Sequence, residues 1–239
     1  MGVQSFTFRH FTIHQQGCAM KVGTDGTLLG AWAKSNTDNP QSILDIGTGT
    51  GLIALMMAQR FQGAQVTAID IDSDACIQAR QNVMLSPYRQ RIEVLNYSLQ
   101  QFASEHTGTF DIIVCNPPFF SNSLTCPDAQ KTIARHTVTL TFRDLCIHAG
   151  HLLKEDGAFS VIIPIERKND MIHEAALAGM LLQSACSIKT SPRKQPKRVL
   201  MSFCKHREYA EDNMESTITI GDAHYKHLTS PYYLKKFDN

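Results

Sequence analysis

The sequence has 239 residues, 43% of them hydrophobic, and a formal net charge of +1 at pH 7. That length suits one α/β domain with a full core, and the composition argues against a disordered chain or a polycation. The N-terminal stretch has no apolar core of the kind a secretory signal carries, and no run of about 18 apolar residues predicts a membrane span. The seven cysteines form no C-x-x-C pair, which argues against a disulfide framework or a zinc site. We expect a cytoplasmic protein that binds no metal; a monomer is the simplest expectation.

From residue 42 onward, short apolar runs alternate with helical patterns. Strands of this kind, separated by helices, form a mostly parallel sheet with helices on both faces. Residues Asp72 or Ser73 can cap one of the helices, and Thr141 with Asp144 forms a capping box for another. The predicted strands are 42–46, 66–69, 92–95, 110–115 and 158–163, and the predicted helices are 52–61, 73–85, 142–153 and 166–179.

Two more strand-like runs, 181–189 and 199–205, are joined by only nine residues. So short a connection cannot hold a helical crossover, so the runs predict an antiparallel hairpin at the sheet edge. The predicted fold class is therefore α/β, a doubly wound, seven-stranded, mostly parallel sheet. We expect a single domain over 1–239, with an N-terminal segment, 1–41, and a C-terminal tail, 206–239, for which no elements are predicted.

A glycine-rich turn, Asp45-Ile-Gly47-Thr-Gly49-Thr-Gly51, follows the first sheet strand. Glycine lets the backbone approach a ligand closely, and ligands of such sheets bind at the carboxyl ends of the strands. A dinucleotide fingerprint would need glycine where Leu52 stands, and no Gly-Lys-Ser/Thr of a P-loop follows. The turn, and Asp70 at the end of the second strand, would each fit an ordinary strand–helix connection alone; together they favour a ligand site.

The spacing D-x-G-x-G-x-G resembles motif I of class I S-adenosylmethionine-dependent methyltransferases, which have a Rossmann-like fold. This resemblance implies that the loop passes under the methionine and ribose of the cofactor, S-adenosyl-L-methionine. It also implies that the acid at the end of the second strand accepts hydrogen bonds from both ribose hydroxyls. The cofactor-binding residues implied by this motif are Asp45, Gly47, Gly49, Gly51 and Asp70.

The strand 110–115 ends in a proline-rich corner, Asn116-Pro117-Pro118-Phe119-Phe120. Two consecutive prolines stiffen the chain at the edge where the ligand is expected. The side-chain carbonyl of Asn116 and the backbone carbonyl of Pro117 offer two acceptors, which match the two N–H bonds of an exocyclic amino group. Phe119 offers a flat face for stacking, which is worth roughly 1–3 kcal/mol per base. A rigid strand-end turn with no chemical role is the alternative.

This corner resembles the (Asn/Asp)-Pro-Pro-(Tyr/Phe) motif of methyltransferases that act on amino nitrogens. The resemblance implies that Asn116, Pro117 and Phe119 are catalytic, that Asn116 also borders the cofactor, and that Pro118 and Phe120 contact the substrate. The implied reaction is a direct, in-line methyl transfer in which positioning supplies most of the catalysis. No general base is needed before the transfer, because the product ammonium is strongly acidic.

Adenine N6, guanine N2 and the glutamine side-chain amide all fit this motif, and the N-terminal segment helps to choose among them. Residues 6–11 and 18–32, FTFRHF and CAMKVGTDGTLLGAW, closely resemble the opening of bacterial tRNA1(Val) (adenine(37)-N6)-methyltransferases. This resemblance implies tRNA as the partner and adenine N6 as the target. It also implies that the N-terminal segment covers the cofactor. The methionine end of the cofactor then lies near Lys21, Gly23, Thr24 and Asp25.

One position departs from that family. Ser98 stands where many relatives carry an acidic residue toward the cofactor's adenine. A serine hydroxyl can still donate or accept one hydrogen bond there. Leu99, or its backbone, is the alternative.

RNA binding must come from local patches, because the whole chain is nearly neutral. The densest cluster lies in the segment that joins the predicted hairpin strands, and its residues are Arg193, Lys194, Lys197 and Arg198. A second candidate in the tail combines Lys226, Lys235 and Lys236 with Tyr225, Tyr232 and Tyr233. Arg135 and His136 follow the segment 121–131 and are expected to contact RNA, with a structural role as the alternative.

Three other functions stay open. Guanine-N2 rRNA methyltransferases often carry a second, duplicated domain, and glutamine-N5 protein methyltransferases place a helical bundle before motif I; 239 residues leave little room for either. Outside enzymes, the alternative is a non-catalytic RNA-binding scaffold of the same fold. Calorimetry distinguishes it, because a scaffold is expected not to bind the cofactor.

Overall fold

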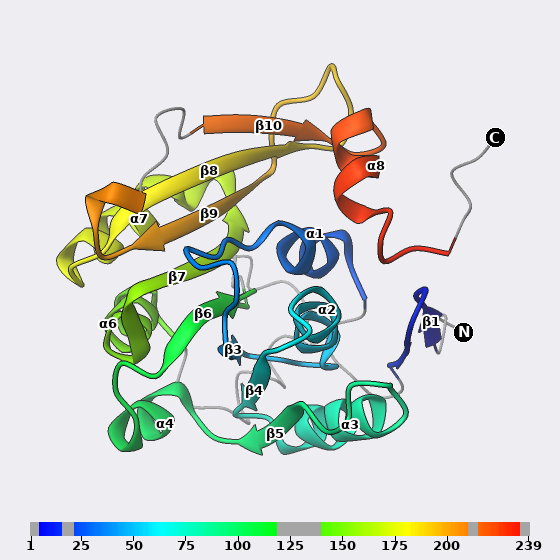
Figure 1. Ribbon diagram of the computed structural model, residues 1–239. Helices are drawn as coiled ribbons and strands as arrows, with labels where there is room; N and C mark the ends of the chain where they lie inside the picture. The colour runs from blue at the N-terminus through cyan, green and yellow to red at the C-terminus, as the bar shows by residue number, and fades with distance from the viewer. Residues whose placement is uncertain (1–4, 16–21, 119–139, 210–214, 235–239) are drawn as a thin grey trace, which may run out of the picture.

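The computed structural model describes residues 5–15, 22–118, 140–209 and 215–234 and has a central eight-stranded sheet (Figure 1). The strand order is β10-β8-β9-β7-β6-β3-β4-β5. Only β9 runs antiparallel to its neighbours, so the predicted mostly parallel α/β sheet is confirmed. The strands are β3 (Ser42–Ile46), β4 (Gln65–Asp70), β5 (Ile92–Asn96), β6 (Phe110–Cys115), β7 (Leu153–Pro164), β8 (Leu181–Lys189), β9 (Arg198–Cys204) and β10 (Glu215–Thr219).

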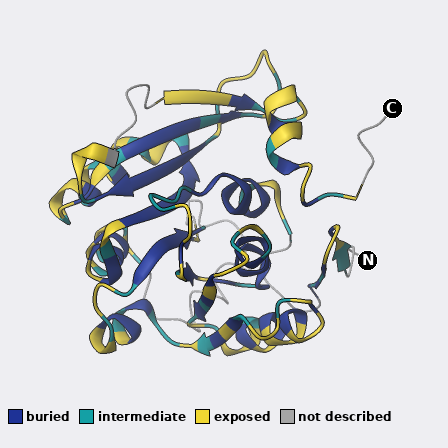
Figure 2. Cartoon of the chain, viewed as in Figure 1, coloured by how far each residue is buried: buried dark blue, intermediate teal, exposed yellow. Residues whose placement is uncertain are grey.

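Helices cover both faces of this sheet (Figure 1). On β6, Ile112 and Val114 join one core and Ile113 and Cys115 the other, because successive side chains of a strand point to opposite faces. The first core lies under α1 (Thr24–Trp32), α2 (Leu52–Arg60) and α3 (Ser73–Met84), and the second under α4 (Leu99–Glu105), α6 (Phe142–Leu152) and α7 (Lys168–Leu177). Figure 2 shows that the central strands and most of α1 and α2 are buried, whereas α3, α4, α6 and α7 have exposed outer surfaces.

The two predicted helix caps are confirmed, whereas the helix expected from 166 begins at Lys168, after the 3₁₀ turn 165–167. The side chain of Asp72 accepts a hydrogen bond from the backbone N–H of Asp74 at 2.9 Å, and Thr141 accepts one from that of Asp144 at 3.0 Å. Such caps satisfy amide groups that the first turn of a helix leaves without a partner. Among the described residues, no helix combines the length and the apolar character that a membrane crossing requires.

The sheet has one strand more than the seven predicted. Strand β10 pairs in parallel with β8, so the β8–β9 hairpin lies one strand inside the edge. Only Ile218 of β10 is buried, and a strand with one buried apolar residue leaves little alternation to detect. The tail also forms α8 (Ala223–Thr229), and short 3₁₀ turns, η1 (Ile165–Arg167) and η2 (Arg207–Tyr209), complete the elements.

The fifth sheet strand also begins earlier than predicted. Strand β7 starts at Leu153, and Gly157, expected to precede the strand, lies inside it where its register against β6 shifts. A Cβ on Gly157 would lie 2.7 Å from Cδ1 of Leu153 and 3.0 Å from the carbonyl oxygen of Phe110. This glycine therefore permits a close approach of two strands.

The N-terminal segment forms a small hairpin and a helix. Strands β1 (Ser5–Thr7) and β2 (Thr12–His14) pair antiparallel, and Phe8 between them is buried. Helix α1 lies against α2, with Gly26 to Trp32 all buried. In this segment the sequence pattern predicted no elements, yet part of it belongs to the core.

Candidate active site

The two motifs meet at one edge of the sheet. Ile46 at the end of β3 lies opposite Ile69 on β4 and Cys115 on β6. The next residues along the chain are Gly47, which begins the glycine turn, Asp70, which ends β4, and Asn116, which begins the proline-rich corner. Strand register therefore brings Gly47, Asp70 and Asn116 to neighbouring positions, as expected for the carboxyl edge of a doubly wound sheet.

All three glycines of the turn adopt left-handed backbone angles, with φ of 68° at Gly47, 58° at Gly49 and 80° at Gly51. A Cβ at Gly47 or Gly49 would meet no atom of the described residues within 4 Å, so the space beside them is open. At Gly51, a Cβ would touch Cβ of Ala79 on α3 at 3.4 Å. The first two glycines therefore border space for a ligand, whereas Gly51 serves the packing of α3.

Asp70 holds the turn from the neighbouring strand. Its Oδ2 accepts a hydrogen bond from the backbone N–H of Gly49 at 2.8 Å, and its Oδ1 accepts one from that of Asp72 at 2.9 Å. Each carboxylate oxygen can accept about two hydrogen bonds. The half-buried carboxylate can thus hold the turn and still accept hydrogen bonds from two hydroxyl groups of a ligand.

Asp45 is fully buried beneath the turn. Its Oδ2 accepts hydrogen bonds from Oγ1 of Thr48 at 2.6 Å and from the backbone N–H of Ala54 at 3.0 Å. Burial raises the pKa of Asp45 from 3.8 to about 7, although these hydrogen bonds lower it. Its Oδ1 is also buried and has no partner among the described residues, so a ligand that donates a hydrogen bond or carries a positive charge would satisfy it.

Asn116 presents a second buried oxygen at the same edge. Its Oδ1 is buried and has no hydrogen-bond partner in the described part of the chain. Pro117 is buried and Pro118 is exposed, so the corner is fixed on one side and open on the other. An acceptor left without a donor costs roughly 1–3 kcal/mol, which is typical of a group reserved for a ligand.

Ser98 already has a structural task. It is the N-cap of α4: its Oγ donates to Oε1 of Gln101 at 2.9 Å and accepts from the backbone N–H of Gln101 at 3.2 Å. The side chain of Leu99 is buried. The backbone of Ser98 is engaged as well: its N–H donates to Oε1 of Gln101 at 3.3 Å and its carbonyl oxygen accepts from the N–H of Phe102 at 3.0 Å. The contact of Ser98 with the cofactor's adenine stays a prediction.

The basic segment lies at the same edge as the glycine turn. Arg198, the first residue of β9, lies opposite Pro164, the last residue of β7. Arg193, Lys194 and Lys197 are exposed. Arg198 is half-buried, and its Nε donates to Oδ2 of Asp25 at 2.8 Å. This ion pair joins a predicted RNA contact to a predicted cofactor contact. The sequence did not indicate it.

Helix α1 begins beside this ion pair. Gly23 is its N-cap, and Thr24 is its first residue; both are exposed. The predicted residues that lie outside the described ones are Lys21, Phe119, Phe120, Arg135 and His136.

Two of the three tyrosines of the predicted tail patch, Tyr225 and Tyr232, are not available to stack on RNA. Tyr225 and Tyr232 are 7% and 3% exposed, and both belong to the core under α1 and α2. The tail therefore packs on the domain, and its proposed role as an aromatic RNA-binding patch was wrong for these two residues. Lys226 is exposed, whereas Lys235 and Lys236 lie outside the described residues.

Asn82 on α3 was missed by the sequence analysis. Its Nδ2 donates to the carbonyl oxygens of Thr50 at 2.8 Å and His14 at 2.9 Å, and its Oδ1 accepts from the backbone N–H of His14 at 2.9 Å. This buried amide ties the N-terminal hairpin to the glycine turn. A polar residue on the inward face of a predicted amphipathic helix was the signal that could have found it.

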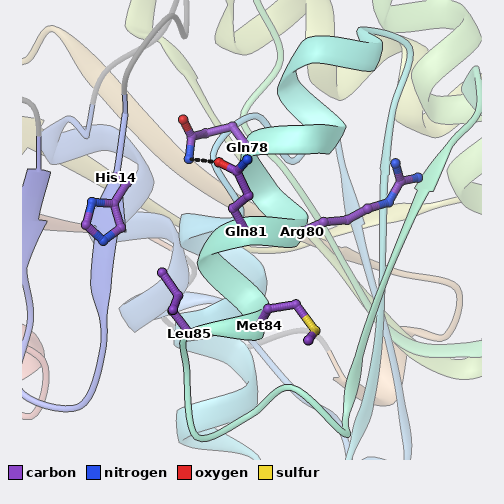
Figure 3. A pocket seen from close by; sticks show the side chains of 6 residues that line it. All are labelled: His14, Gln78, Arg80, Gln81, Met84 and Leu85. Atoms are coloured by element: carbon purple, nitrogen blue, oxygen red, sulfur yellow. Dashed lines mark hydrogen bonds between the residues drawn. The ribbon is translucent and has the colours of Figure 1, made fainter.

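An open groove of about 550 Å³ lies between β2 and α3 (Figure 3). None of the predicted site residues lines it. In the close-up, Gln78 and Gln81 hydrogen-bond to each other from successive turns of α3. In the described part of the chain, no group of three or more His, Cys, Asp or Glu residues is arranged to hold a metal ion.

Known proteins resemble this chain in sequence and in fold. The family model for the methyltransferase small domain matches residues 25–176. A tRNA1(Val) (adenine(37)-N6)-methyltransferase of Phocaeicola vulgatus is 51% identical over 198 residues, which cover 83% of this chain and 82% of that protein. The enzyme of the same name from Parabacteroides distasonis is 41% identical over 234 residues, which cover 96% of this chain and 98% of that protein.

Two solved structures share the fold at low identity. A predicted O-methyltransferase from Agrobacterium tumefaciens superposes with a TM-score of 0.64 at 19% identity, over 87% of this chain and 96% of that one. Pyrococcus horikoshii TYW2 in complex with MeSAdo gives a TM-score of 0.60 at 12% identity, over 86% of this chain and 74% of that one. Both likenesses support the class I methyltransferase fold.

Proposed function

The chain belongs to the tRNA1(Val) (adenine(37)-N6)-methyltransferase family, and we propose that its sheet edge methylates N6 of adenine 37 in tRNA1(Val). It is an S-adenosylmethionine-dependent methyltransferase that modifies tRNA. We propose that the protein acts in the cytoplasm, because its substrate, tRNA, is found there. The relatives favour adenine over guanine N2 and glutamine, and they favour an enzyme over a scaffold.

The observation that carries this proposal is that Oδ1 of Asn116 is buried without a hydrogen-bond partner among the described residues. Asn116 lies one residue beyond β6, level with the glycine turn. An adenine amino group has two hydrogens and needs two acceptors. In the proposal, Oδ1 of Asn116 accepts one of them and the carbonyl oxygen of Pro117 accepts the other. With both N–H groups hydrogen-bonded, a pyramidal nitrogen is favoured, and its lone pair is less delocalised into the ring and can attack the methyl group.

The residues of the turn fit S-adenosylmethionine. Gly47 and Gly49 leave open space for a ligand, and Asp70 can accept hydrogen bonds from two ribose hydroxyls. Oδ1 of Asp45, which has no partner in the described part of the chain, suits a positively charged amino group. The cofactor supplies an activated methyl group on a positively charged sulfur. The chain's own task is to hold the amino nitrogen in line with that group.

The bond changes then balance without a protein base. When bound, S-adenosylmethionine would supply the methyl carbon for the new bond to N6 and its sulfur would keep the electron pair of the broken bond, and the methylated nitrogen would release its proton to water. Asn116 stabilises the developing positive charge through its carbonyl dipole, which is the kind of fixed electrostatic contact that enzymes use most.

RNA binding is proposed at the basic segment. Arg193, Lys194 and Lys197 are exposed at the same edge as Asn116, and in the proposal they bind phosphates that flank the target base. Phe119 keeps the catalytic role and Phe120 the substrate contact that the motif implies, and Arg135 and His136 remain expected RNA contacts.

The decisive experiment is methyl transfer with labelled S-adenosylmethionine to tRNA that lacks the modification, followed by mass spectrometry of the nucleosides. We expect N6-methyladenosine, and no label in a tRNA1(Val) transcript whose adenine 37 is replaced by guanine. Label in N2-methylguanosine or in protein would contradict the proposal.

A further inference from the structure

An ion pair joins the two halves of the proposed site. Nε of Arg198 lies 2.8 Å from Oδ2 of Asp25, although the two residues are 173 positions apart in the sequence. The two side chains are 35% and 30% exposed, respectively, so water screens this pair less than it would screen a fully exposed pair. The contact connects the first turn of α1 with the start of β9.

On the cofactor side, the first turn of α1 is packed closely against the helix that leaves the glycine turn. A Cβ at Gly26 would lie 3.1 Å from Cδ2 of Leu52, the residue that follows Gly51. One turn later, a Cβ at Gly30 would lie 2.9 Å from Met56. Because the two helices touch this closely, a shift of Asp25 displaces Leu52 and disturbs the end of the turn.

On the RNA side, the backbone around Arg198 is also fixed. The N–H of Lys197 donates to the carbonyl oxygen of Ile188 at 3.0 Å, and the N–H of Ile165 donates to that of Lys197 at 3.2 Å. The backbone next to Arg198 is thereby anchored to β8 and to η1, the turn that follows β7, so Arg198 can hold Asp25 from a fixed position.

We propose that Arg198 is a positioning residue for the cofactor half of the site and is not a phosphate contact. Its ion pair with Asp25 fixes the first turn of α1 beside the glycine turn, while Arg193, Lys194 and Lys197 remain for RNA. Transfer of Arg198 to a phosphate would leave the carboxylate of Asp25 uncompensated next to a polyanion, which is unfavourable. This proposal deepens the proposed function and rests on it.

The test uses Asp25→Asn, Arg198→Gln and the double variant of the full-length protein. Calorimetry measures the dissociation constant of S-adenosylmethionine without RNA, and filter binding measures tRNA affinity across a salt series. We expect both single variants to raise the cofactor dissociation constant by a similar factor, about two- to fivefold, and the double variant to do no more than either. The salt dependence of tRNA binding should stay unchanged.

Matched controls separate this role from a general loss of stability. Arg167 and Asp170 form an ion pair of 2.7 Å on the outer surface, with side chains 50% and 58% exposed, so Asp170→Asn should leave cofactor affinity unchanged. Arg198→Lys keeps the charge but not the planar guanidinium, and it should recover part of the lost cofactor affinity. It also serves as the test if Arg198→Gln fails to fold.

Two results would overturn the proposal. If Arg198→Gln lowers the salt slope of tRNA binding by about one unit and leaves cofactor affinity intact, Arg198 contacts a phosphate. If only Asp25→Asn weakens cofactor binding, Asp25 acts without Arg198. The calorimetric result does not involve RNA, so it can be read even if the proposed tRNA substrate is wrong.

Discussion

The two halves of the proposed site are built in different ways. At the ends of β3 and β4, Asp45 and Asp70 are held by hydrogen bonds, and the glycine turn has a fixed left-handed backbone. Between β8 and β9, Arg193, Lys194 and Lys197 are long side chains on an exposed segment. A small ligand needs fixed groups, whereas a polyanion can be bound by flexible charges. Substitutions in the first half should therefore have large, specific effects, and those in the second small, salt-dependent ones.

The largest effect is expected where the two halves meet, at Asn116. Asn116→Ala removes an acceptor for the amino group, and the rate of methyl transfer in single-turnover assays should fall by about 100-fold or more. Cofactor affinity, measured by calorimetry, should change little. Asn116→Asp keeps an acceptor and should retain more activity than the alanine variant; equal losses of rate and cofactor affinity in Asn116→Ala would contradict the assigned role.

The next largest effect tests the fixed backbone. Gly49→Ala places a Cβ in the open space beside the turn, and cofactor affinity should fall by about tenfold or more. Gly108→Ala is the matched control, because Gly108 has a similar φ, 53° against 58°, but lies at the opposite edge of the sheet. Both variants should lose about 1–2 kcal/mol of unfolding free energy from backbone strain. Only the first should lose cofactor affinity, and a loss in both would argue against an open ligand space at Gly49.

A pH titration tests the buried acid of the same half. Because burial raises the pKa of Asp45 from 3.8 to about 7, folded Asp45 keeps its proton between these values while the unfolded chain has lost it. Stability of the ligand-free protein should therefore fall as pH rises from about 4 to 7 and then level off. Cofactor affinity should rise up to about tenfold between pH 6 and 8, as Asp45 ionises. Asp45→Asn should abolish both trends, and a pH dependence that persists in this variant would assign it to another group.

The smallest effect is expected in the basic segment. Combined charge reversal, Arg193→Glu with Lys194→Glu, should weaken tRNA binding about fivefold near physiological salt and lower the log–log salt slope by about two units. Cofactor affinity should not change. Lys226→Glu on α8 is the matched control, because Lys226 is also exposed but the neighbouring Tyr225 is buried in the core and not available to RNA. An unchanged salt slope in the double variant would remove this segment from the RNA-binding surface.

The sequence predicted best what depends on neighbours along the chain. Apolar runs followed by glycine or proline located β3 and β6, and the register of the parallel strands then brought Gly47 and Asn116 together. The capping box of α4 is also readable from neighbouring residues, because Gln101 stands three positions after Ser98. The prediction that Ser98 contacts the adenine did not take this signal into account.

Contacts between distant residues were not predictable in this way. A hydrophobic pattern records which side of an element faces the core, but not which distant residue lies opposite. The pairing of Asp25 with Arg198 and the burial of Tyr225 and Tyr232 are of this kind. Strand β10 was missed for the same reason, because its pairing with β8 supplies the stability that its own sequence lacks.

The N-terminal hairpin has a consequence for how the chain is made. Phe8 stacks on Tyr233 with ring centroids 5.8 Å apart, and the N–H of Arg9 donates to the carbonyl oxygen of Tyr232 at 2.7 Å. On the ribosome, β1 and β2 emerge early but find this partner only after translation has passed Tyr233. The side of the hairpin that meets Tyr232 and Tyr233 is thus among the last to be covered, although Asn82 on α3 can bind β2 earlier. A nascent chain stalled before α8 would leave the ring of Phe8 uncovered on that side.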